Sequence, residues 1–372
     1  MPGHHQSGSL HEGSLVSIPD KQKQLQEIFL TQAAYCEELG SPFMARLCRL
    51  FAEHLVEDHA GASYLLSLNK PESFWSHALA LRVAGALHAL VLSDKCEVLK
   101  SVYPPYHSDV TDDAMWKAVS HAMQTHVDFF ITYLNSAPQT NEVRRSSVLL
   151  PGFITIAEKT GLPLTLSELG ASAGINLCWD CFGYKLDSIE WGNADSGVFM
   201  TPEWKGEPPP EAREILILDR GACDLAPVDY QNAEEKLHLL SYIWADQKDR
   251  FERTENALSI LTENKYTVDK ADISHWLPDR LAMKWQGSAH VIYHTIAWQY
   301  QGETACRANQ ALIEEAGSKA STEAPLAWLR FEPDGQDPGA AITLTLWPDG
   351  IEHTLGRADY HGRWIHWIGL DS

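Results

Sequence analysis

Apolar and polar residues alternate with a helical periodicity through the first third of the chain. Apolar positions recur every three or four residues in "KQKQLQEIFLTQAAYCEEL", "SPFMARLCRLFAEHLVED" and "DDAMWKAVSHAMQTHVDFFITYL", and this spacing predicts amphipathic helices. Gly40 ends the first of them, and Ser41 with Pro42 begins the next. We therefore expect a helical N-terminal domain over residues 20–140, preceded by a polar, disordered tail over residues 1–19.

The periodicity of the apolar residues changes after residue 140. Short runs rich in β-branched and aromatic residues now alternate with helical segments, notably 233–262 and 303–317, which predicts a parallel sheet with crossover helices. The predicted strands are "LPLTLSEL", "EILILDRG", "KYTVDKAD", "AHVIYHTI" and "PLAWLRFE". "AITLTLWPDGIEHTL" and "GRWIHWIGL" follow with no helix between them, and the "PDG" turn predicts a terminal antiparallel hairpin.

Residues 178–213 interrupt this alternation. They carry a β-ribbon signal around "GNADSG" and end in three prolines, so we interpret them as an insertion after the first strand, of a kind that can serve as a lid. The predicted fold class is α/β, with a Rossmann-like domain over 141–372 behind the all-α N-terminal region. Its mixed sheet is mostly parallel with a terminal antiparallel hairpin, and this plan resembles that of class I S-adenosylmethionine-dependent methyltransferases.

Charge and composition narrow the range of partners. The chain has 50 acidic and 29 basic residues, a net charge of −21, which argues against a broad nucleic-acid or anionic-membrane surface. It contains neither an apolar run of bilayer-spanning length nor a signal-peptide core. Seven scattered cysteines suit free thiols in a reducing compartment. We expect a cytoplasmic protein that acts on a small molecule, without nucleic-acid or membrane partners, and the sequence leaves its oligomeric state open.

The stretch "LSELGASAG" places an acid and two glycines where the first predicted strand meets a helix. Ligands of open parallel sheets bind at such strand ends, and glycine permits both a tight turn and a close approach. Glu168, Gly170 and Gly174 match the methyltransferase pattern of an acid followed by G-x-G-x-G, whereas Ser172 replaces the middle glycine. The dinucleotide and phosphate-loop fingerprints do not fit. The alternative is a turn whose glycines serve only packing.

Other predicted strand ends supply further polar residues. By the same resemblance, Asp219 would bind the ribose hydroxyls of S-adenosylmethionine and Asp272 the adenine amino group, with Asp224 and Asp229 as nearby alternatives for the ribose. His294 ends the fourth strand and is the candidate catalytic base or orienting group, since histidine titrates near neutral pH. The alternative for His294 is a buried histidine that is hydrogen-bonded within the protein.

Several polar and aromatic residues are candidates for contact with the substrate. An ion-pairing or capping role is the alternative for those on helices, and also for Arg250 and Arg253, which share a helical face with Asp246 and can clamp an anion. No metal site is expected, because the C-x-x-C of Cys178 and Cys181 lacks a second pair. The substrate candidates are Asn141, Arg145, Asn176, Asp180, Trp298 and Tyr300.

The chain also resembles a bacterial family of uncharacterised proteins, domain of unknown function 2332. The likeness extends from "QAAYCEELGSPFMARLCRLFAEHL" to "LSYIWADQKDRFERTENAL", and "LSELGASAGINLCWDCFGY" is its most specific part. Membership of this family implies no particular activity. The sequence therefore predicts an S-adenosylmethionine-dependent methyltransferase of unknown substrate. The alternatives are a non-catalytic ligand-binding or regulatory protein on the same sheet, and an enzyme that uses another nucleotide.

Overall fold

The computed structural model describes most of the chain and divides it into two compact units. The first unit comprises Met1–Pro138 with Trp244–Gln247, and the second comprises Gln139–Ile243 with Lys248–Ser372. Of the predicted tail over 1–19, only the last two residues are described, and they begin a helix. The described residues are 18–54, 63, 65, 78–106, 109–135, 138, 141–283 and 285–370.

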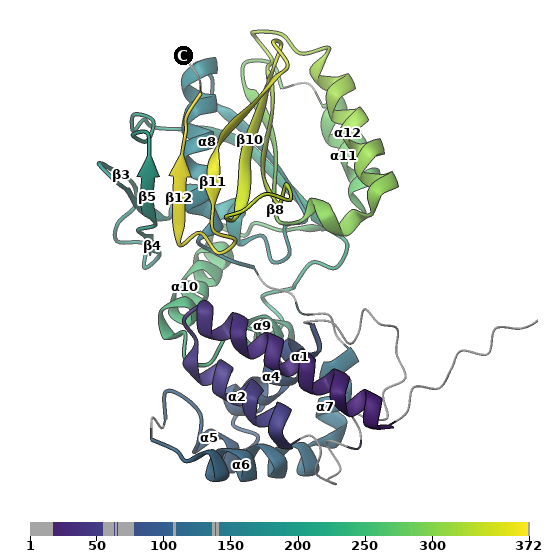
Figure 1. Cartoon of the computed structure of the whole chain (residues 1–372). Coiled ribbons are helices and arrows are strands. Elements are labelled where there is room, and N and C mark those ends of the chain that lie inside the picture. The colour runs from purple at the N-terminus through teal and green to yellow at the C-terminus, as the bar shows by residue number, and fades with distance from the viewer. Residues whose placement is uncertain are drawn as a thin grey trace, which may run out of the picture. The chain divides into compact units, whose positions relative to one another are not determined.

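The described part of the first unit is helical, as the apolar spacing predicts (Figure 1). Ser41 precedes its second helix, and Asp246 accepts hydrogen bonds from the Ser41 hydroxyl and from the Phe43 amide, the latter at 3.0 Å. Asp246 therefore caps the start of this helix. The helices are α1 (Ile18–Glu38), α2 (Pro42–His54), α4 (Ala78–Leu92), α5 (Glu97–Lys100), α6 (Asp112–Thr125) and α7 (Val127–Asn135).

The second unit is built on a nine-stranded sheet within the described residues. Its parallel part has the spatial order β7-β6-β1-β8-β9. The chain runs from the central strand β1 to β6 and β7 on one side and then crosses to β8 and β9 on the other, so β1 lies at a topological switch point. The bounds are β1 (Leu164–Leu169), β6 (Ile217–Asp224), β7 (Asp269–Lys270), β8 (Ala289–Thr295) and β9 (Leu326–Glu332).

Helices cover both faces of this sheet (Figure 1). On one face, α8 (Arg145–Thr160) approaches β9 so closely that a Cβ on Gly152 would lie 2.6 Å from the Leu329 side chain. On the other, α11 (Ile273–Ala282) and α12 (Glu303–Gly317) share a buried apolar cluster with Leu169, Ile292 and Trp328. Strands β1 and β8 are buried along their whole length and β9 along most of it, which explains their nearly continuous apolar runs.

The sheet ends in an antiparallel part that confirms the predicted hairpin. Strands β10 (Ala340–Trp347) and β11 (Ile351–Ala358) pair across the "PDG" turn, and β12 (Trp364–Trp367) adds a further antiparallel strand. The predicted insertion supplies β5 (Glu203–Gly206), which pairs in parallel with β12 at the sheet edge.

The rest of the insertion forms a small separate sheet. Its strands are β2 (Gly183–Leu186), β3 (Ile189–Gly192) and β4 (Phe199–Met200). The hairpin between β2 and β3 turns at Asp187, before the predicted "GNADSG" ribbon.

Helix bounds differ from the sequence prediction in two places. The predicted helix over 233–262 is two helices, α9 (Ala233–Ser241) and α10 (Lys248–Asn264), whereas α12 matches its prediction. Helix α11 was not predicted, because Pro278 inside it weakens the helical signal. Among the described residues, no helix combines the length and apolar composition needed to cross a bilayer.

Candidate functional site

The turn that follows β1 is left-handed at three positions. The φ angles of Gly170, Ser172 and Gly174 are +71°, +54° and +80°. A left-handed residue other than glycine costs about 1–2 kcal/mol, so the middle position is one that favours glycine and is occupied by serine. The amides of Gly170 and Ala171 both donate to the Cys223 carbonyl, at 2.9 and 3.1 Å, which fixes the turn against the end of β6.

The open sides of both glycines are covered by protein. A Cβ on Gly170 would lie 2.7 Å from the Cβ of Ala297, and one on Gly174 would lie 2.7 Å from Cγ2 of Val268. The loops after β8 and before β7 therefore use the space that a side chain would fill. Both positions thus favour glycine for its left-handed backbone and for the close packing of these loops.

Two buried polar atoms at this turn have no hydrogen-bond partner among the described residues. They are the Ser172 hydroxyl oxygen and the Asn141 Oδ1. The Asn141 Nδ2 donates to the Ala171 carbonyl at 2.6 Å, so this amide lies directly against the turn. Buried polar groups are nearly always satisfied in folded proteins. The pair therefore marks a place where the polar groups of a ligand can bind.

The acid at the end of β6 is Asp224, and the prediction that Asp219 ends this strand is wrong. Strand β6 begins at Ile217, and its register pairs Leu169 of β1 with Cys223. The Asp224 carboxylate accepts the Ser172 amide at 2.8 Å and a second amide, that of Ala226, at 2.9 Å. It thus holds the glycine turn from the neighbouring strand.

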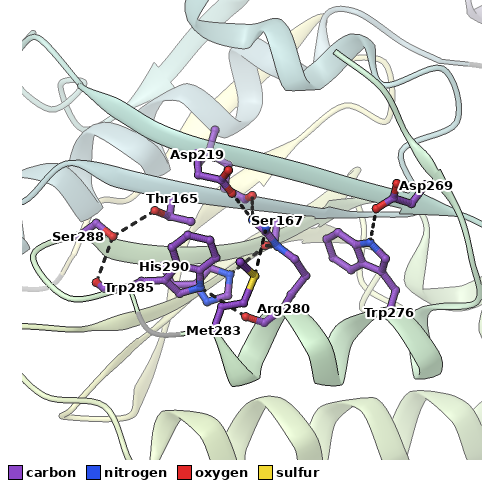
Figure 2. A network of polar contacts seen from close by, with 11 residues as sticks. Thr165, Ser167, Asp219, Asp269, Trp276, Arg280, Met283, Trp285, Ser288 and His290 are labelled. Atoms are coloured by element: carbon purple, nitrogen blue, oxygen red, sulfur yellow. Dashed lines mark hydrogen bonds and ion pairs between the residues drawn. The ribbon is translucent and has the colours of Figure 1, made fainter. Parts of the chain in front are cut away.

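Asp219 lies near the start of β6 in a separate polar network on the α11 face of the sheet (Figure 2). Arg280 of α11 donates to Asp219 at 2.8 Å and to the Ser167 hydroxyl at 3.0 Å. Ser167 is also hydrogen-bonded to Nε2 of His290 at 2.9 Å. Burial, and then the charge of Arg280, lowers the pKa of His290 to about 3. Each of these groups is hydrogen-bonded to another member of the network, and Arg280 thereby joins the sheet to α11.

Asp272 is the N-cap of α11. Its exposed side chain accepts the Ser274 amide at 2.8 Å. It follows β7, as predicted, but its carboxylate is already used to satisfy a free amide at the helix start.

Glu168 is buried beneath the turn, on the α8 face of the sheet. It is 2 % exposed and accepts the Tyr293 hydroxyl at 3.2 Å. Burial raises the pKa of its carboxyl to about 8, with the Tyr293 hydrogen bond opposing the shift and the charge of Asp224 adding to it. Glu168 is therefore mostly protonated at neutral pH, which suits a hydrogen-bonding role better than a charged one.

His294 is fully buried, and both of its ring nitrogens are hydrogen-bonded. Nδ1 lies 2.7 Å from Glu332, and Nε2 accepts the indole N–H of Trp328 at 3.0 Å. This network assigns the proton to Nδ1. The same Glu332 oxygen accepts the amides of Ala297 and Trp298 at 2.9 and 3.1 Å, and the Trp298 ring stacks on the imidazole. This arrangement favours a positioning role for His294, holding the loop after β8, over the role of a base.

Residues 141–145 border the carboxyl ends of β1 and β8. Arg145 donates to the carbonyls of Thr295 and Tyr360, at 3.4 and 3.0 Å. Glu142 is 2 % exposed and forms an ion pair with Arg250 at 2.8 Å. Burial opposes ionisation of Glu142, but Arg250 and the other cations around it hold the pKa of this carboxyl below its ordinary value.

The remaining substrate candidates belong to two different short helices. Asn176 is buried and accepts the Ser146 hydroxyl at 2.7 Å. Asp180 forms a two-point ion pair with Arg220 at 2.8 and 2.9 Å. These two belong to η2 (Ile175–Cys181), whereas Trp298 and Tyr300 belong to η3 (Trp298–Gln301). Tyr300 is 78 % exposed, so it lines no buried pocket.

The cysteines of the described residues are free thiols. Cys178 is buried, and burial raises the pKa of Cys181 to about 11, so neither is a reactive thiolate at neutral pH. Among these residues, no three His, Cys, Asp or Glu side chains are grouped as metal ligands.

The sequence analysis did not identify three residues of this site. They are Arg144 and His361, which lie near Glu142, and Glu332, which binds His294. No local motif marks them. They join the site through contacts between distant segments, such as the turn at Gly362 that packs against the Arg144 backbone.

Comparison with known proteins supports the family resemblance. No curated protein and no solved structure matches the chain. A family model described as "Uncharacterized protein conserved in bacteria (DUF2332)" matches residues 26–367, which is nearly the whole chain. The chain therefore belongs to this family of uncharacterized proteins conserved in bacteria.

Proposed function

We propose that this protein binds S-adenosylmethionine at the carboxyl end of β1 and transfers its methyl group to a small molecule. The observation that carries the proposal is the left-handed turn at the topological switch point, with the unsatisfied polar atoms of Ser172 and Asn141 beside it. Ligands of open α/β sheets bind at this position, and a cofactor rich in donors and acceptors would satisfy both atoms.

The residues around the turn are compatible with such a cofactor. We assign its recognition to the side chains of Ser172 and Asn141, because Gly170 and Gly174 are packed by protein. Asp224 lies beside the turn and accepts two amides. A carboxylate has about four acceptor positions, so it can also accept ribose hydroxyls. When bound, the sulfonium would supply an activated methyl group.

The contribution of the protein to methyl transfer would be mainly positional. The reaction is an in-line displacement, and holding the two reactants in line removes much of the entropic barrier. We assign no general base, because both nitrogens of His294 are hydrogen-bonded within the protein. An acceptor that is already nucleophilic at neutral pH fits this site.

Calorimetric titration of the full chain with S-adenosylmethionine and with its demethylated product tests the proposal. We expect saturable binding that weakens about tenfold in Asn141→Ala, since a hydrogen bond to a charged or buried group contributes about 1.5 kcal/mol. Asn264→Ala is the matched control, because Asn264 also donates to a backbone carbonyl, at 2.9 Å, but on an exposed helix end. A folded protein that binds neither compound at millimolar concentration would refute the proposal. Thermal stabilisation by ATP or NAD alone would indicate a different nucleotide.

A second candidate is a ligand-binding or regulatory protein that does not catalyse methyl transfer. It is favoured by Ser172 at the middle position of the turn and by the fully engaged His294. If Ser172→Gly binds S-adenosylmethionine and the parent chain does not, this second function gains support.

A further inference from the structure

Three arginines without carboxylate partners lie together in the second unit. Arg144, Arg145 and Arg253 form no ion pair with any described residue. In contrast, most arginines of the chain are paired. In a protein with a net charge of −21, unpaired guanidinium groups have many carboxylates available, so their clustering needs a specific reason. The paired arginines are Arg46, Arg49, Arg213, Arg220, Arg250, Arg280, Arg307, Arg330, Arg357 and Arg363.

Two chain segments bring these arginines to one place. Arg144 and Arg145 lie at the start of α8, while Arg250 and Arg253 lie three residues apart on one face of α10. Glu142 lies between the segments and pairs with Arg250 at 2.8 Å. This buried ion pair ties the start of α8 to α10 and leaves the other three guanidinium groups around it.

Arg253 is the most unusual member of the cluster. Its Nε and Nη2 are buried and have no hydrogen-bond partner among the described residues. A buried cation is costly unless it is paired. Burial, and then repulsion from Arg144, lowers the pKa of Arg253 to about 10. Arg253 is thus a half-buried cation that lies near like charges and forms no ion pair with a described carboxylate.

The described carboxylates near the cluster act on it electrostatically but form no ion pair with Arg144, Arg145 or Arg253. Glu142 is paired with Arg250. Glu332 binds His294 and two amides through Oε1, whereas its Oε2 is buried and has no hydrogen-bond partner among the described residues. Asp359 is paired with Arg363 at 2.7 Å. Asp249 also acts on Arg253 electrostatically but is exposed. Burial and the nearby Arg250 lower the pKa of His361 to about 4, so this histidine is neutral at neutral pH.

The cluster borders the carboxyl edge of the sheet. Arg145 donates to the carbonyl of Thr295, the last residue of β8, and Asn141 in the same segment donates to the carbonyl of Ala171 in the glycine turn. Two of the unpaired cations, Arg144 and Arg145, therefore lie in the same stretch of chain as Asn141, which contacts the proposed cofactor turn.

We propose that Arg144, Arg145 and Arg253 bind an oxyanion group of the substrate, a phosphate or a carboxylate, so that the methyl acceptor is a small anionic molecule. This inference rests on the proposed function for the role of the anion as substrate. The planar fork of arginine suits either group, because it can donate two parallel hydrogen bonds to one oxyanion. The burial of the Arg253 donors requires a group small enough to enter the protein.

Thermal unfolding of the full chain with oxyanions tests the site, with chloride added to keep the ionic strength constant. We expect inorganic phosphate or sulfate to raise the melting temperature saturably. Arg253→Gln and Arg144→Gln should each weaken the apparent affinity at least about tenfold, and Arg253→Lys should retain part of it. Arg307→Gln, at an exposed arginine of α12, is the matched control and should respond as the parent does. A larger response to phosphate than to acetate or malonate would indicate a phosphate ester, and the reverse a carboxylate.

A further readout keeps the test decisive. In buffer without oxyanions, Arg253→Gln should melt no lower than the parent, because it removes a buried, repelled charge; a structural arginine would give a lower value. The proposal is overturned if no oxyanion stabilises the parent saturably, or if both glutamine variants keep the full response.

The same variants separate this inference from the proposed function. Loss of the phosphate response with retained S-adenosylmethionine binding supports a substrate site. Phosphate that competes with S-adenosylmethionine in the parent would assign the arginines to the cofactor and overturn the substrate role. An arginine-dependent phosphate response in a chain that does not bind S-adenosylmethionine would refute the proposed function and leave only the anion site.

Discussion

Replacing Glu168 with glutamine tests whether the acid beneath the glycine turn is neutral. Glu168 is 2 % exposed, and burial raises the pKa of its carboxyl from 4.5 to about 8. Glutamine has nearly the same shape, and its amide oxygen can still accept the Tyr293 hydroxyl. The change therefore removes the ionisable group and keeps the packing.

The sign of the effect follows from proton linkage. Between pH 4.5 and about 8, the folded protein holds a proton on Glu168 that the unfolded chain has released. The free energy of unfolding of the parent therefore falls as the pH rises through this window. The loss is about 1.4 kcal/mol for each pH unit, or about 3–4 kcal/mol between pH 5 and pH 8. Glu168→Gln lacks this term, so its stability relative to the parent should rise by that amount.

Urea unfolding followed by tryptophan fluorescence at pH 5, 6, 7 and 8 measures this difference. Other titrating groups, such as His290 with its pKa of about 3, act equally on both proteins and cancel. Glu158→Gln is the matched control, because Glu158 lies on the exposed face of α8, and its difference from the parent should be nearly independent of pH. A constant difference for Glu168→Gln over the same range would show that Glu168 titrates normally, and the reasoning from burial would then be wrong.

Three other substitutions probe the packing around the site by the same unfolding assay. Arg220→Met should lower the free energy of unfolding by about 3 kcal/mol, because it leaves the mostly buried carboxylate of Asp180 unpaired. Ser172→Gly should change it by less than about 1 kcal/mol, since relief of a left-handed serine is offset by the greater freedom of glycine in the unfolded chain. Gly152→Ala should lower it by about 1–3 kcal/mol, because the added Cβ would lie 2.6 Å from Leu329.

Each of these has its own control. Arg307→Met removes an arginine from an exposed pair and should have almost no effect. Asp187→Gly relieves another left-handed residue, at φ +48° in an exposed hairpin, and should behave as Ser172→Gly does. Adding Leu329→Val to Gly152→Ala should recover part of the lost stability; a double variant that is simply additive would argue against the predicted contact.

The sequence by itself determined the fold class and the position of the turn. Strands β1, β8 and β9 and helix α12 were predicted because their apolar runs and helical spacing are local properties, and both faces of these strands are buried. The change of periodicity near residue 140 is also a local property of the sequence, and so are the glycines after β1. Both could therefore be recognised without the structure.

The tertiary structure decided the register of the strands and the partners of the polar side chains. The apolar "ILIL" run predicted a strand that ends at Asp219, but pairing with β1 sets β6 over Ile217–Asp224 and leaves Leu218 56 % exposed. This register of β6 against β1 brings Asp224 to the glycine turn.

The use of each polar residue was likewise decided by folding. Asp219 binds Arg280, 61 positions later in the chain, and His294 binds Glu332, 38 positions later. Arg144 acts electrostatically on Arg253, 109 positions later in the chain, because the Glu142–Arg250 ion pair holds the start of α8 against α10. A residue type and its spacing indicate what a side chain can do. Which partner it binds, and how far its pKa moves, depends on burial and on groups that are distant in the sequence.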